Sequence, residues 1–180
     1  MRNMAETVFA TFAVPLRPDF KPHNSPIIEV MKKRNTYTRV VSANSYGTVC
    51  LPFPAIPDTN VEAFRLVGYD KEAQILYFDP IKHLEAGHAY LFKSHSRRAC
   101  FLRDGEEDVC RPIKGEQMAG TFNVSLPIGP NAMVLVGDEW VLAPRDIYLD
   151  AFSAWLILMV RPISNHHGQI AMHINMEKRL

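Results

Sequence analysis

From Thr36 onward the chain is built of short apolar or alternating segments that recur between turn-forming residues. This spacing is typical of successive β-strands and not of amphipathic helices. Asp104-Gly105 and Gly137-Asp138 each lie between two such segments and supply residues that tolerate the positive φ of a tight hairpin. The pattern predicts an all-β fold, an antiparallel β-sandwich or a partly closed barrel, and the single polar face of several segments favours the sandwich.

The apolar and alternating segments predict strands at residues 36–42, 47–53, 63–69, 74–79, 88–93, 98–103, 107–112, 119–125, 132–137, 139–143, 146–150, 155–161 and 169–174. A short helical turn is expected around Asp58–Ala63, where Asp58 or Thr59 would cap it. A Gly-Thr pair opens the strand at Gly47 and again the one at Gly120, and a Tyr-Leu strand follows later in each half. This echo allows two similar small β lobes as an alternative to one.

Residues 1–35 differ from the rest because Pro15, Pro18, Pro22 and Pro26 interrupt any regular element. The sequence therefore predicts a proline-containing N-terminal arm over 1–35 and a β-sandwich-like domain over 36–180. A length of 180 residues suits one folded core.

The net charge of +1 gives no electrostatic field that would attract nucleic acid, so no nucleic-acid partner is expected. The longest apolar run, Ala151–Val160, is shorter than the roughly 20 residues of a membrane-spanning helix and is expected to be a buried strand. No transmembrane span is predicted. Glu6 interrupts the apolar stretch near the N-terminus, and no signal peptide is visible in the chain.

Four segments, in this order, carry a family resemblance: Tyr46–Phe53, Leu84–Phe92, Gly120–Phe122 and Arg145–Leu149. Together they resemble a β-rich module common in Bacteroides and Prevotella surface or secreted proteins, often C-terminal to leucine-rich or other repeats. The resemblance covers about residues 36–161. It implies a non-catalytic extracellular or cell-envelope module that has no catalytic residues to assign here.

Sequence motifs for catalysis are missing: there is no GxSxG elbow, no HExxH and no glycine-rich phosphate loop. We therefore assign no catalytic residue, no metal and no cofactor. His83, Glu85 and His88 lie close in sequence, but the turn at Gly87 is expected to separate them. Acidic residues such as Asp79 and Glu85 leave open the alternative of a small β-fold hydrolase with acidic or histidine residues in a loop-built cleft.

Three cysteines leave at least one thiol unpaired within a monomer. A hairpin with the loop Asp104-Gly105-Glu106 would place Cys100 opposite Cys110, close enough for a disulfide in an oxidising compartment. In the cytosol both would be free thiols. Cys50 is expected to be a buried thiol.

Two aromatic residues are the candidate ligand contacts, because both lie next to turns. Tyr46 precedes Gly47 and Trp140 follows the Gly137-Asp138 turn, so each ring could stack on a sugar or on a partner's side chain, or pack in the core. The leading hypothesis is a structural or interaction module that binds a protein or glycan. Histidines or acids buried together in a pocket would instead favour the hydrolase.

Overall fold

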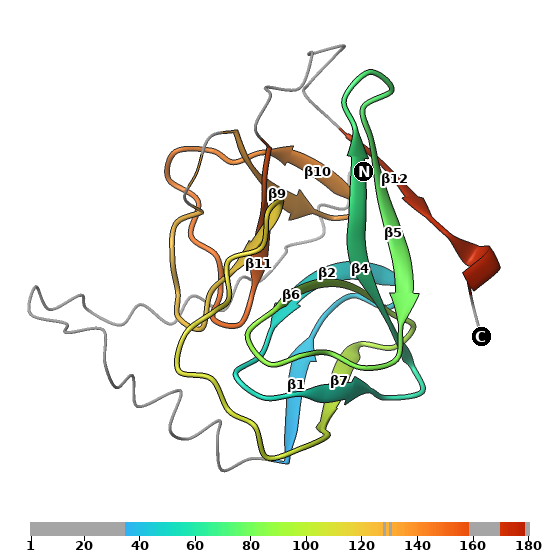
Figure 1. Cartoon of the computed structure of the whole chain (residues 1–180), viewed down its shortest axis with the longest axis vertical. Coiled ribbons are helices and arrows are strands. Elements are labelled where there is room, and N and C mark those ends of the chain that lie inside the picture. Colours follow the sequence, from blue (N-terminus) through green and yellow to red (C-terminus); the bar gives the residue numbers. More distant parts are fainter. Residues whose placement is uncertain (1–34, 128, 130, 159–169, 179–180) are drawn as a thin grey trace, which may run out of the picture.

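The computed structural model describes residues 35–127, 129, 131–158 and 170–178. These residues form an all-β fold of three sheets with a single 3-10 turn at Met176–Lys178 (Figure 1). The expected all-β class is confirmed. Residues 159–161 and 169 of the strands expected at 155–161 and 169–174 lie outside the described residues, as do residues 1–34 of the expected N-terminal arm.

The largest sheet has five strands in the order β12-β5-β4-β6-β2 and curls into a half-barrel. Its neighbours are antiparallel except for β12, which runs parallel to β5. The strands are β2 (Ser45–Cys50), β4 (Val61–Asp70), β5 (Ile75–Ile81), β6 (Ala89–Ser94) and β12 (Ala171–Ile174).

Two smaller sheets flank it. The three-stranded sheet has the order β1-β7-β3, with β1 (Thr36–Val40), β7 (Arg98–Arg103) and β3 (Ala55–Pro57). The four-stranded sheet has the order β10-β9-β11-β8, with β10 (Glu139–Leu142), β9 (Ala132–Val136), β11 (Ala154–Ile157) and β8 (Met118–Gly120).

The five-stranded sheet is the central layer because its strands β4 and β6 contribute side chains to a core on each face. Along β4, Ala63 packs into a core shared with the three-stranded sheet, and the next residue, Phe64, packs into a second core shared with the four-stranded sheet. In β6, Phe92 packs into the first of these cores and Leu91 packs into the second. Successive side chains of a strand point to opposite faces, so adjacent apolar residues in β4 and β6 supply both cores.

The outer edge of β2 is joined to the four-stranded sheet through Thr48. The Thr48 hydroxyl donates to the carbonyl of Ala154 (3.0 Å) and accepts from its amide (2.9 Å), which replaces a pair of ladder hydrogen bonds. Cys50 N donates to Phe152 O (3.0 Å) next to it. Arg39 of β1 reaches the same place and donates to Thr48 O (2.8 Å) and Ser153 Oγ (2.6 Å). All three sheets therefore meet at this junction.

Three local expectations are wrong. Residues 107–112 do not form a strand. Arg103 Nη2 donates a hydrogen bond to Asp108 Oδ1 (2.6 Å), and the Val109 amide donates to Pro52 O without forming a ladder. Residues 146–150 form only the single bridge from Leu149 to Ser125. No helical turn occurs at 58–63, where Val61 N closes a tight turn onto Asp58 O (2.8 Å) and β4 begins. The short strand β3 was not expected.

Replacing Thr48 by valine tests the junction. The change keeps the shape of the buried side chain but leaves the Ala154 amide and carbonyl unpaired, which should lower the free energy of unfolding by about 1–3 kcal/mol. Urea denaturation followed by circular dichroism measures it. Thr38→Val on the exposed face of β1 is the control and should change stability by less than about 0.5 kcal/mol. Equal effects of the two substitutions would contradict the role of Thr48.

Candidate functional site

Tyr46 lies in an open hollow at the rim of the central sheet, on the face that carries the second core. The Tyr46 hollow has a volume of about 410 Å³. Its lining comes from four strands, one hairpin turn and the 3-10 turn, and consists of Tyr46, Glu62, Lys93, Asp138, Met172, Ile174 and Met176. The hollow therefore forms where β2 and β12, the two edges of the half-barrel, are bridged by a loop of the four-stranded sheet.

The register of the central sheet places three of these side chains in one row. Tyr46 is opposite Lys93, and Lys93 is opposite Glu62 on the other side. The Lys93 ammonium lies 5.2 Å from the centroid of the Tyr46 ring, a distance suited to a cation–π contact. Glu62 also pairs with His95, with 3.7 Å between Oε2 and Nε2. A phenol ring, an ammonium and a carboxylate are thus adjacent on one surface.

A tight turn completes the hollow from the four-stranded sheet. Gly137, at φ +62°, lets β9 reverse into β10 and confirms the hairpin expected at Gly137-Asp138. Asp138 then accepts a hydrogen bond from the backbone amide of Tyr46 (3.2 Å). The expected site residue Tyr46 is therefore half-buried, held from both sheets, and open to solvent at the hollow.

The structure corrects the expectation that Trp140 contacts a ligand. Its ring is fully buried in the second core, and its Nε1 donates to Met172 Sδ (3.0 Å), so the ring is not presented to a ligand. Although Trp140 follows a turn, its inward direction is set by β10 and by the bridge to Ile170. Trp155 is buried, as expected.

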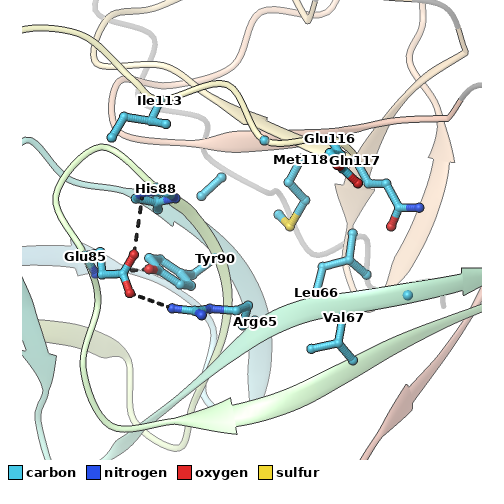
Figure 2. A pocket seen from close by; sticks show the side chains of 13 residues that line it. Arg65, Leu66, Val67, Glu85, His88, Tyr90, Ile113, Glu116, Gln117 and Met118 are labelled. Atoms are coloured by element: carbon cyan, nitrogen blue, oxygen red, sulfur yellow. Dashed lines mark hydrogen bonds and ion pairs between the residues drawn. The ribbon is translucent and has the colours of Figure 1, made fainter.

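The second polar depression lies where β4 and β6 separate, and we call it the Arg65 pocket (Figure 2). Arg65 Nη2 donates to Glu85 Oε1 (2.9 Å), and Glu85 Oε2 is 3.6 Å from His88 Nε2. The Tyr90 hydroxyl accepts from the amide of Glu85 (3.0 Å). Hydrogen bonding to Tyr90 and the pair with Glu85 raise the pKa of Arg65, which fixes it as a cation. Burial raises the pKa of Tyr90.

The candidate histidines do not gather. His88 pairs with Glu85, whereas His83 pairs with Asp104 on another part of the surface (2.9 Å). Their side chains are 40% and 71% exposed. Among the described residues, no three histidine, cysteine or carboxylate side chains converge as a metal site would need. His173, on β12, packs edge-on against Tyr77, with 5.5 Å between the ring centroids.

The hairpin that would place Cys100 opposite Cys110 does not form in the structure. Cys100 lies opposite Thr38 of β1, whose hydroxyl donates to its sulfur (3.7 Å), and Cys110 lies in the loop that follows β7. Both carry thiols in the structure. Cys50 is the buried thiol that the sequence predicts, and burial raises its pKa to about 12.

Sequence reasoning missed most of the lining of both depressions. Lys93 and Glu62 interrupt otherwise apolar alternation in β6 and β4, which was a usable signal for a polar rim. Asp138 and Arg65 gave no such signal, since their neighbours come from strands distant in sequence. In the part of the chain that the structure describes, no helix has the length and apolar character needed to cross a membrane.

Comparison of the chain with protein-family models, with curated proteins and with solved structures finds no match in any of the three.

Thiol alkylation tests the burial of Cys50. Because the thiolate is the reactive form and the Cys50 pKa is about 12, iodoacetamide at pH 8 should label Cys110 and Cys100 but leave Cys50 unmodified until urea unfolds the protein. Peptide mass spectrometry after reduction, and again without it, reads each position and detects any disulfide. Labelling of native Cys50 as fast as Cys110 would contradict the buried environment.

Proposed function

We propose that the protein is a non-catalytic interaction module, secreted or held at the cell envelope, that binds a glycan in the Tyr46 hollow. The observation that carries the proposal is the row of Tyr46, Lys93 and Glu62 with Asp138 beside it. The envelope or extracellular placement is supported only by the resemblance of the segments from Tyr46 to Leu149 to surface-protein modules.

The chemistry of the hollow suits sugar hydroxyls. Carboxylates at Glu62 and Asp138 accept hydrogen bonds from hydroxyls, and the Lys93 ammonium donates to them. The Tyr46 ring and the thioethers of Met172 and Met176 give apolar surface to the C–H faces of a sugar. A volume of about 410 Å³ is within the range of small-ligand sites.

A protein partner is the other occupant that the sequence allows. The centre of a protein interface is depleted in charge and anchored by apolar or aromatic side chains. The Tyr46 hollow has three charged side chains around one half-buried ring, which favours the glycan.

A hydrolase is the second candidate, supported by the Glu85–His88 pair in the Arg65 pocket. A catalytic acid–base pair is usually desolvated, and a nucleophile lies within hydrogen-bond reach of its base. The side chains of Glu85 and His88 are instead 60% and 40% exposed. Turnover of a chromogenic ester or glycoside that disappears in His88→Gln would favour the hydrolase.

Tyr46→Ala tests the glycan proposal. On an array of bacterial and host oligosaccharides, the wild-type protein should bind a defined subset, and loss of the ring should weaken that binding by about tenfold or more. Lys93→Met, which keeps the aliphatic stem and removes the ammonium, should weaken the same glycans. Tyr148→Ala is the matched control because Tyr148 is 58% exposed and does not line the hollow.

Circular dichroism establishes that each variant is folded before its binding is compared. Absence of glycan binding by the wild-type protein would overturn the proposal, and so would binding that Tyr46→Ala and Lys93→Met leave unchanged.

A further inference from the structure

The Arg65 pocket is a gap in the central sheet. The β4–β6 ladder ends at Phe64–Leu91, but the β4–β5 ladder continues to Asp70–Ile75. Beyond Phe64 one edge of β4 therefore faces the pocket and not a strand. The pocket has a volume of about 370 Å³ and is enclosed by three segments: residues 65–68 of β4, the stretch from Glu85 to Tyr90, and the loop from Ile113 to Met118.

Charged groups line two sides of the pocket. Figure 2 shows Arg65, Glu85 and His88 on one side, with Glu116 and Gln117 across from them. Glu85 lies between the Arg65 guanidinium, with which it forms an ion pair, and the His88 imidazole. The Arg65 side chain is 49% exposed and its guanidinium has five N–H donors, so donors are available beyond the bonds to Glu85 and Tyr90.

Apolar side chains lie between the two charged sides. Leu66 and Met118 point into the pocket from β4 and from the start of β8, and Ile113 covers it from the loop (Figure 2). Met118 is 6% exposed, and it belongs to the second core, which gives this apolar surface a rigid backing. A ligand that fits must therefore carry an anionic end, a cationic end and an apolar group.

We propose that the Arg65 pocket is a second ligand site, which binds a free α-amino acid with an apolar side chain. The α-carboxylate is bound by Arg65 beside His88, the α-ammonium by Glu116 and the Gln117 side-chain carbonyl, and the side chain packs on Leu66 and Met118. The site is distinct from the Tyr46 hollow, with which it shares no lining residue.

The distribution of charge favours a zwitterion over a simple anion or cation. A monocarboxylate would pair with Arg65 but would also meet the Glu85 carboxylate, and it carries no ammonium to pair with Glu116 across the pocket. An amine alone would face the Arg65 guanidinium. An amino acid places each of its charges opposite a group of the other sign.

Gly68 offers a way to close the pocket without changing any charge. It lines the pocket, follows the bulge at Val67, and has nothing within 4 Å of the place where a side chain would begin. It is also not among the positive-φ residues, so a larger residue is tolerated by the backbone. Gly68→Leu should therefore add a side chain at the β4 edge of the pocket and leave the fold intact.

Saturation-transfer NMR and calorimetry with L-leucine, L-isoleucine, L-methionine and L-phenylalanine test the proposal. At least one of them should bind the wild-type protein, and Arg65→Gln and Gly68→Leu should each weaken it by about tenfold or more. Arg98→Gln, an exposed arginine of β7 outside the pocket, is the matched control and should bind like the wild type.

Two analogues of the bound amino acid separate the charged contacts. The amide lacks the carboxylate and the N-acetyl derivative lacks the ammonium, and both should bind about tenfold more weakly than the parent. Failure of all four amino acids to bind would overturn the proposal, as would equal binding by Gly68→Leu or by both analogues. Because Tyr46→Ala should leave this binding unchanged, its outcome is independent of the glycan site.

Discussion

The fold depends on the hydrogen bonds that close the outer edge of β2. An exposed strand edge leaves amides and carbonyls unpaired, and here the Thr48 hydroxyl and the Cys50 amide join that edge to residues 152–154. Phe152 adopts φ +60°, a region that is sparsely populated for a bulky residue and costs about 1–3 kcal/mol. Burial of its ring in the first core and the bond from Cys50 offset that cost. Arg39 ties β1 to the same place, so a few polar contacts align two separate hydrophobic cores.

Both polar depressions arise where the regular pairing of the central sheet stops. The Tyr46 hollow lies at the end of the β2–β6–β4 ladders, and the Arg65 pocket lies where β6 leaves β4. Within the ladders, alternate residues such as Ala63 and Phe64 are committed to one core or the other. Polar side chains on the same strands are accommodated near the end of these ladders, at Lys93 and Glu62, or past the last β4–β6 pair, at Arg65. The sheet thus provides rigid positions for Lys93 and Arg65 while its interior stays apolar.

The all-β class, most strands and the Gly137-Asp138 hairpin could be predicted from the sequence, because two-residue alternation and turn chemistry are local signals. The candidate site was predicted only at Tyr46. Trp140 was misplaced because its burial depends on Ile170 and Met172, which reach it from the other end of the chain's β-region. Residues 107–112 were expected to form a strand, but Arg103 binds Asp108 and the Val109 amide donates to Pro52 O just after β2. Long-range register and single side-chain hydrogen bonds are not encoded in any short window of sequence.

The hydrogen bond from the Tyr46 amide to Asp138 joins two sheets at the Tyr46 hollow. Tyr46 belongs to the central sheet and Asp138 to the β9–β10 hairpin of the four-stranded sheet, and β12 adds Met172 from a third direction. A molecule that contacts all three would bind the layers together at this end, in addition to the hydrogen bonds at Thr48 and Tyr46. Its binding energy would add to the cohesion of the folded state through mass action. A higher occupancy of the hollow would then go together with a higher resistance of the module to unfolding and proteolysis.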